Sequence, residues 1–267
     1  MTQMPFADPF LMVAPTGARR TARDHPALPL STADIVDTAV ACHAAGADAL
    51  HLHVRDAMGA HTLDAGRYLE ALTALDAALP GLRVQITTEA ADVLDVPAQL
   101  ACLAAVKPRW ASISVREIAR SPELADRVYG TCGANGTTVQ HILYDTADMA
   151  ALRDWQAGGI VRADQTDMIF VLGRYAAGQM SAPADLEPFM QAVPDGAVWM
   201  ACAFGQTEHQ CLAEAERQGG ALRVGFENNI HDAQGRPFAD NAASVRALRE
   251  LLRTAQTAGA DPIDPTH

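Results

Sequence analysis

The sequence has few aromatic residues and few positive charges. Phenylalanine, tryptophan and tyrosine make up 5% of the 267 residues, and 20 lysines and arginines stand against 32 aspartates and glutamates, for a formal net charge of −12. Proteins that bind nucleic acid or an anionic membrane surface need basic patches, and single-strand binders also need aromatic stacking platforms. The composition therefore argues against both partners and favours a protein that acts on small molecules.

Long apolar runs and paired cysteines are also missing. No stretch approaches the roughly 20 apolar residues that cross a bilayer, and residues 1–13 have two prolines and no basic region, unlike a signal peptide. The five cysteines are scattered and never form CxxC. A disulfide framework or a thiolate zinc knuckle is therefore not expected, and a reducing cytoplasm is the expected compartment.

Apolar runs of strand length precede helix-like segments eight times along the chain. The expected strands cover residues 9–15, 47–54, 82–88, 110–115, 138–144, 167–173, 197–203 and 221–226. The expected helices cover residues 31–45, 65–78, 96–106, a segment from 122 onward, 146–157, 182–193, 208–218 and 241–258. Eight such units predict an α/β fold, a single-domain (β/α)₈ TIM barrel over residues 1–267 with its active site at the carboxyl ends of the strands. An open doubly wound sheet is the alternative, but TGARRT stands where a GxGxxG motif would be expected.

Two histidines, His51 and His53, stand out in the segment ADALHLHVRD. Side chains two residues apart on a strand share a face, and this pair lies at the carboxyl end of the second expected strand, where barrel active sites lie. The pair could form half of a metal site, or it could be two hydrogen-bonded core histidines. The charged residues that follow directly, Arg55 and Asp56, favour the metal site.

A site with two neutral histidines needs an anionic ligand, and Glu227 in LRVGFENN is the candidate. Leu222, Val224 and Phe226 share one face and should pack on helices, which leaves Arg223 and Glu227 in the lumen. The arginine and glutamate could also form a structural ion pair. In a closed barrel the second and eighth strands both flank the first, so Glu227 can reach the histidines.

Further polar residues are expected to face inward. Gln85, Thr87 and Glu89 share the inward face of the third expected strand. Ser112 and Ser114 share a face of the fourth, where each could equally be a satisfied hydroxyl in the lumen. An inward carboxylate such as Glu89 is costly unless it is paired or functional.

The segment TGARRT follows the first expected strand at the same mouth of the barrel. Gly17 and Arg19 of this segment are expected to contact substrate. Two neighbouring arginines suggest an anionic ligand, although a solvated loop would explain Arg20 as well.

Four motifs in order, TGARRT with DHPALP, GADALHLHVRDAMG, FVLGRYAAGQ and LRVGFENN, resemble the beta-keto acid cleavage enzymes, whose founding activity is 3-keto-5-aminohexanoate cleavage. The resemblance implies a TIM barrel that binds Zn²⁺ or another divalent metal and forms a homo-oligomer, a dimer or a tetramer. It also implies that a β-keto acid and acetyl-CoA are converted into acetoacetate and a new acyl-CoA. In the family mechanism the metal stabilises an enolate, which attacks the acetyl thioester.

Carried over residue by residue, the resemblance implies that His51, His53 and Glu227 are the metal ligands. Arg223 matches the arginine of the RVGFE motif. Thr87 stands at the position of an active-site serine, and Ser112 stands at the position of a substrate-contacting threonine.

Three departures from the founding members bear on mechanism. Asn228 replaces an aspartate assigned to proton relay, and an amide cannot accept that proton. Glu89-Ala90 replaces two glycines, so we hypothesise that Glu89 is the general base. Arg19 and Ile142 replace acidic residues that hold the substrate amino group, which predicts a neutral or anionic β-keto acid in place of 3-keto-5-aminohexanoate.

Two other readings of the motifs stay open. A different metal-dependent barrel lyase or hydrolase, or a non-haem iron oxygenase, could use the same two histidines and carboxylate. Amidohydrolases, by contrast, place HxH on the first strand and need further histidines and an aspartate. A binding barrel with structural histidines is the non-enzymatic alternative.

Overall fold

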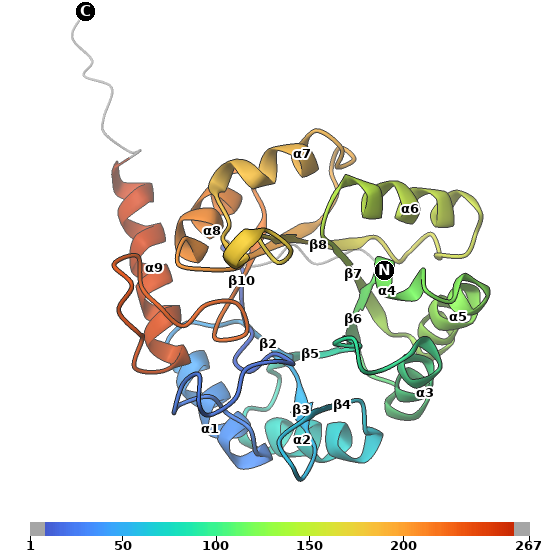
Figure 1. Ribbon diagram of the computed structural model, residues 1–267, viewed down its shortest axis with the longest axis horizontal. Coiled ribbons are helices and arrows are strands. Elements are labelled where there is room, and N and C mark those ends of the chain that lie inside the picture. The colour runs from blue at the N-terminus through green and yellow to red at the C-terminus, as the bar shows by residue number, and fades with distance from the viewer. Residues whose placement is uncertain (1–8, 259–267) are drawn as a thin grey trace, which may run out of the picture.

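The computed structural model describes residues 9–258, and these form a closed barrel of eight parallel strands (Figure 1). Around the barrel the order is β1-β10-β9-β8-β7-β6-β5-β2. The strands are β1 (Leu11–Val13), β2 (Ala49–Leu52), β5 (Arg83–Thr87), β6 (Trp110–Ser114), β7 (Thr138–Leu143), β8 (Asp167–Leu172), β9 (Trp199–Ala203) and β10 (Ala221–Val224). Each lies inside one of the eight expected strands, so the predicted fold class is confirmed. Residues 1–8 and 259–267 of the expected domain lie outside the described residues.

Helices form a ring outside the strands (Figure 1). They are α1 (Thr32–Ala44), α2 (Ala65–Ala78), α3 (Val96–Val106), α4 (Val115–Ile118), α5 (Ala125–Asn135), α6 (Thr146–Ala157), α7 (Glu187–Met190), α8 (Glu208–Arg217) and α9 (Asn241–Ala258). Side chains that accept hydrogen bonds from the first turn begin several of them: Ser31 caps α1, Asp64 caps α2 and Asp95 caps α3. Capping satisfies amide groups that otherwise have no partner in the helix.

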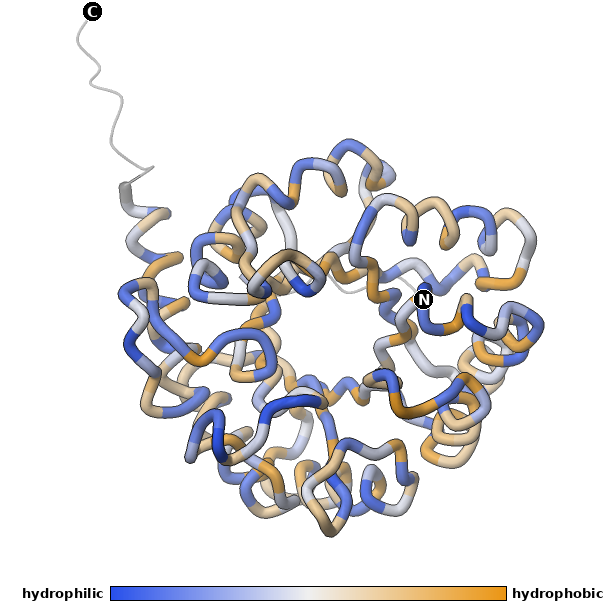
Figure 2. The backbone as a smooth tube through the Cα atoms, in the orientation of Figure 1, coloured by the Kyte–Doolittle hydropathy of each residue, from blue (hydrophilic) through white to orange (hydrophobic). Residues whose placement is uncertain are grey.

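The alternation of side chains along the strands divides the core into two layers. Leu50 and Leu52 of β2 pack outward with helix residues in the main apolar cluster, whereas Met12 and Ala49 pack inside the barrel. Figure 2 shows hydrophobic and hydrophilic residues mixed along the helices of the outer ring, as expected when one face of each helix packs on the barrel. Because His51 has the parity of Ala49, its imidazole points into the barrel.

Two local expectations are wrong. The helix expected over residues 182–193 is a 3₁₀ turn (Pro183–Leu186) followed by the single turn of α7. The strand expected to continue through Val54 ends at Leu52, and a short antiparallel hairpin follows, made of β3 (Val54–Arg55) and β4 (His61–Thr62). Asp56 accepts hydrogen bonds from the amides of Met58 and Ala60 in its turn, which fixes the hairpin. Among residues 9–258, no helix is both long and apolar enough to cross a membrane.

Candidate active site

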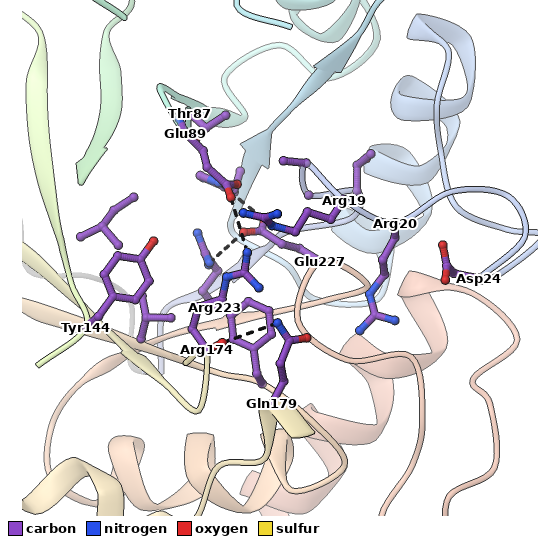
Figure 3. A pocket seen from close by; sticks show the side chains of 17 residues that line it. Arg19, Arg20, Asp24, Thr87, Glu89, Tyr144, Arg174, Gln179, Arg223 and Glu227 are labelled. Carbon is purple, nitrogen blue, oxygen red and sulfur yellow. Dashed lines mark hydrogen bonds and ion pairs between the residues drawn. The ribbon is translucent and has the colours of Figure 1, made fainter. Parts of the chain in front are cut away.

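A cavity of about 250 Å³ opens at the carboxyl ends of the strands (Figure 3). Its wall combines side chains from the β1–α1 loop, β2, β5, β7, β8 and β10, which are far apart in the sequence. The sequence analysis placed the active site at this end of the barrel.

Three candidate metal ligands converge in this cavity. Oε2 of Glu227 lies 3.6 Å from Nε2 of His51 and 3.4 Å from Nε2 of His53. Both ring nitrogens of His53 and Oε2 of Glu227 are buried without a hydrogen-bond partner among the described residues. Ligands held ~2.0–2.2 Å from a tetrahedral metal ion stand roughly 3.3–3.6 Å apart. The arrangement therefore fits a divalent metal, which would satisfy atoms that the protein leaves unpaired.

Neighbouring side chains prepare His51 for that role. Nδ1 of His51 lies 2.8 Å from Oε1 of Gln85, whose amide nitrogen donates to Gln140. Because an amide oxygen only accepts, the proton of His51 is on Nδ1 and its Nε2 lone pair faces Glu227. Burial, reinforced by the nearby Arg223 charge, lowers the pKa of His51 to about 3. The imidazole is therefore neutral, the form that binds metals.

The chain after β10 brings Glu227 to the histidines. The amide of Glu227 donates to the carbonyl of Ala14, and a Cβ at Gly225, where φ is +144°, would lie 2.4 Å from that same oxygen. Only glycine fits this close approach. A Cβ at Gly17 would lie 2.7 Å from Cγ of Glu227, so the loop after β1 packs directly against the Glu227 side chain.

Arg223 keeps Glu227 ionised. Its guanidinium donates to Oε1 of Glu227 at 3.1 Å and to Sγ of Cys202 at 3.2 Å. Burial by itself would raise the pKa of Glu227, but the charge of Arg223 outweighs it and holds this pKa well below its ordinary value. The inward arginine predicted from the sequence is thus a direct partner of the carboxylate ligand.

The β3–β4 hairpin holds both sides of the site. Arg55 donates from one guanidinium nitrogen to the carbonyls of Gly17, at 2.5 Å, and Arg20, at 3.0 Å. His61 lies with Nε2 2.6 Å from the carbonyl of Glu89, and its ring packs 5.3 Å from that of His53. The sequence analysis did not anticipate this role, because it placed the histidine pair at the end of one strand and took Arg55 only as a charged residue that follows it.

Glu89 lies in the loop after β5, near the metal ligands. Its Oε2 is 3.9 Å from Nε2 of His53, and its Oε1 is 3.9 Å from a guanidinium nitrogen of Arg174. The hydroxyl of Thr87 accepts a hydrogen bond from the amide of Glu89. The next amide, that of Ala90, donates to the half-buried carboxylate of Glu117. The backbone of the Glu89 segment is therefore held in place while its carboxylate reaches into the cavity.

Other predicted residues lie in different surroundings. Arg19 lines the cavity, but its guanidinium pairs at 2.7 Å with Asp92 across the mouth. Ser112 is buried, and its hydroxyl has no partner among the described residues. The side-chain amide of Asn228 is also buried and unpartnered there. Neither Ser112 nor Asn228 lines the cavity, so substrate contact by Ser112 and a catalytic role of Asn228 stay predictions.

Tyr144, Arg174 and Gln179 are among the cavity residues that the sequence analysis did not single out. Arg174 had a signal, since it stands two residues beyond β8 in the motif FVLGRYAAGQ. That position matches the rule that polar residues past the strand ends of a barrel belong to its site.

Comparison with known proteins identifies a family. The sequence matches the family described as beta-keto acid cleavage enzyme over residues 9–265. It is 27% identical over 259 residues to the 3-keto-5-aminohexanoate cleavage enzyme of Fusobacterium nucleatum, covering 89% of this chain and 88% of that protein. It is 25% identical to the 3-oxoadipate:acetyl-CoA acetyltransferase of Cupriavidus necator, covering 90% of this chain and 87% of that protein. The apo structure of ObcA is similar in fold, with a TM-score of 0.67 at 15% identity over 86% of this chain and 63% of that one.

Proposed function

Because the chain belongs to the beta-keto acid cleavage enzyme family, we propose that it transfers an acyl group between a β-keto acid and acetyl-CoA in a metal-dependent reaction. The products would be acetoacetate and a new acyl-CoA. Acetyl-CoA appears in the names of the Cupriavidus necator relative and of the 3,5-dioxohexanoate:acetyl-CoA acetone transferase of Paraburkholderia graminis, 25% identical to this chain. The observation that carries the proposal is the convergence of His51, His53 and Glu227, two of which, His51 and Glu227, line the cavity.

The metal would be held by these three side chains, and zinc is the first candidate. Three protein ligands leave coordination positions open, which is typical of catalytic sites. When bound, the ion supplies a Lewis acid that draws electrons from carbonyl and carboxylate oxygens and so acidifies the carbon between them. Ligand type alone does not separate zinc from manganese, cobalt or iron.

We assign the proton-accepting role to Glu89. Its carboxylate lies within 3.9 Å of the metal-ligating edge of His53 and is 17% exposed, so it can meet a substrate in the cavity. Thr87 holds the amide of Glu89, and Arg223 keeps Glu227 ionised so that it remains a ligand. Asn228 cannot accept a proton through its amide.

The charges around the cavity favour a neutral or anionic substrate. Arg19, Arg20, Arg174 and Arg223 line it together with three carboxylates, and two of those carboxylates are engaged by the metal site or the base role. Ile142 contributes an apolar surface. The third carboxylate, that of Asp24, accepts hydrogen bonds from the amide and hydroxyl of Thr21, so a substrate ammonium group would meet these guanidinium groups with no unengaged carboxylate beside them.

The proposal is tested with purified protein, acetyl-CoA and a panel of short β-keto acids. We expect acetoacetate and the matching acyl-CoA to appear in equal amounts, with a lower kcat/KM for 3-keto-5-aminohexanoate than for its uncharged analogue. Acetoacetate without acyl-CoA would indicate a hydrolase or lyase. The same preparation, analysed by light scattering, tests the predicted homo-oligomer.

The role of Glu89 has its own test. Glu89→Gln removes the proton acceptor but keeps the size of the side chain, so we expect turnover to fall about 10²–10⁴-fold with metal content unchanged. Glu70→Gln, an exposed position on α2, is the matched control. Near-normal turnover of Glu89→Gln with full metal occupancy would end this assignment.

A further inference from the structure

Arg174 carries hydrogen-bond donors that the protein does not use. Its side chain is 11% exposed, lines the cavity, and lies with its guanidinium carbon 5.1 Å from the centre of the Phe204 ring. Its nearest carboxylate oxygen, Oε1 of Glu89, is 3.9 Å away, beyond hydrogen-bond distance. Within residues 9–258, no acceptor lies within hydrogen-bond range of this guanidinium.

The other three arginines of the cavity wall are engaged. Arg223 donates to Glu227, and Arg19 is paired with Asp92. Arg20 donates to the backbone carbonyl of Asn228 at 3.3 Å. Among the arginines of the described cavity wall, Arg174 is therefore the one whose guanidinium donates no hydrogen bond within the protein, so all of its donors can bind a ligand.

The backbone around Arg174 is held in place, so the guanidinium does not have to be ordered by the ligand. Gly173 has a φ of +77°, and a Cβ there would lie 2.9 Å from the backbone of Met180 and Ser181, so the loop closes tightly on itself. Gln179 donates to the carbonyl of Arg174. Stacking on Phe204 orients the planar guanidinium, which suits two parallel bonds to a carboxylate.

The carboxylate of Glu89 lies 3.9 Å from Arg174 on one side and 3.9 Å from the candidate metal ligand His53 on the other. Figure 3 shows Glu89 and Arg174 in the cavity. The two separations of 3.9 Å through the Glu89 carboxylate place the guanidinium roughly within 10 Å of His53 Nε2. Ile142, Val171 and Phe204 line the same cavity and provide an apolar wall for methylene groups. A short chain reacting beside Glu89 can thus extend to Arg174.

We propose that Arg174 binds a second carboxylate at the far end of the substrate, so that the preferred substrate class is a short β-keto dicarboxylic acid. This inference rests on the proposed function, which supplies the β-keto acid group at the metal site. The far carboxylate forms two charge-assisted hydrogen bonds with Arg174, while the methylene groups between the two ends pack on the apolar wall.

The test compares 3-oxoadipate with its 6-monoamide, which has the same length but no second charge. The unmodified protein should favour the diacid by about 10- to 100-fold in kcat/KM. Arg174→Gln should remove this preference mainly by raising KM for the diacid, and it should leave the amide almost unaffected. Arg174→Lys keeps the charge and should restore part of the preference.

Controls separate this binding site from general effects of charge. Arg153→Gln removes an exposed arginine outside the cavity and should leave the preference unchanged. Equal use of diacid and amide by the unmodified protein would overturn the inference, even if every Arg174 variant failed to fold. So would an equal loss on both substrates in Arg174→Gln, which would place the reactive carboxylate or acetyl-CoA on Arg174. Cleavage of no β-keto acid in the panel would instead count against the proposed function.

Discussion

The two sides of the cavity are built differently. His51, His53, Arg223 and Glu227, here called the metal wall, have side chains that are 1–11% exposed, and two of them, His51 and Arg223, lie on barrel strands. Glu89 and Arg174, here called the loop wall, each lie two residues beyond the end of a strand, and their side chains are 17% and 11% exposed. Strands fix atoms in place, whereas loops can change in sequence without disturbing the barrel. The comparison teaches that the candidate metal ligands are held by the barrel, whereas the proposed base Glu89 and the free guanidinium of Arg174 are supplied by loops.

The walls also differ in how their charges are satisfied. On the metal wall, Arg223 and Glu227 neutralise each other at 3.1 Å. On the loop wall, Arg174 and Glu89 stay 3.9 Å apart, so both retain hydrogen-bonding capacity for a ligand. Changes on the metal wall, and at the proposed base Glu89, should therefore affect every substrate alike, whereas changes at Arg174 should discriminate between substrates.

The largest effect is expected from His53→Phe on the metal wall. This change removes one of three ligands, so metal content should fall well below one ion per chain and turnover by about 10³-fold or more. Neither ring nitrogen of His53 has a hydrogen-bond partner in the described structure, so the metal-free protein should lose little stability. Elemental analysis measures the metal content, a turnover assay measures the activity, and thermal unfolding in the presence of a chelator measures the stability of the metal-free protein. His43→Phe, at an exposed position on α1, is the control, and full metal content in His53→Phe would refute the ligand assignment.

A smaller effect, on metal affinity, is expected from Gly17→Ala, because the added methyl group in the loop after β1 would collide with Glu227 of the metal wall. Its Cβ would lie 2.7 Å from Cγ of Glu227, in a backbone conformation with φ of +68°. We expect metal affinity to fall about 10- to 100-fold because the carboxylate is displaced. Gly81→Ala is the matched control, since Gly81 has a φ of +88° with nothing within 4 Å of its added Cβ. Equal metal affinity in both variants would show that the contact with Glu227 does not matter.

The smallest effect concerns Glu117, which supports the loop wall by accepting from the amide of Ala90. Burial, with a further contribution from the charge of Glu89, raises the pKa of Glu117 from 4.5 to about 7. The folded state therefore holds this proton more tightly than the unfolded state, and stability is lost as pH rises from about 4.5 through 7. Glu117→Gln keeps an oxygen for Ala90 but has no proton to lose.

We expect Glu117→Gln to gain about 1–3 kcal/mol in free energy of unfolding relative to the unmodified protein between pH 5 and pH 8. Denaturant titrations at several pH values measure the difference. Parallel pH profiles for the two proteins would exclude a buried proton on Glu117. Glu70→Gln, exposed on α2, should show no such divergence.

The fold was largely predictable because the strands and helices carry clear local patterns. Apolar runs of four to eight residues indicate most of the strands. Capping residues such as Ser31, Asp64 and Asp95 stand at the starts of helices. The helix predicted over residues 182–193 does not form as one element, because Pro183 and Pro188 interrupt a pattern that otherwise resembles a helix. The β3–β4 hairpin was missed because two-residue strands leave almost no periodicity to detect.

The candidate site was predictable in its ligands but not in its supports. Alternation on β2 and β10 was enough to turn His51 and Arg223 into the lumen, and closure of the barrel places Glu227 beside them. The contacts of Arg55 and His61 depend on which carbonyls the hairpin meets after folding. No local pattern encodes such contacts.

By itself, the sequence determined the barrel, its inward faces and the histidines and glutamate that meet in it, because side-chain alternation and element order are local properties of the chain. Only the tertiary structure decided that Arg19 is paired with Asp92 while Arg174 keeps its donors free. The physical reason is that the partner of a charged side chain depends on distances between loops far apart in the sequence, and those distances exist only once the barrel has closed.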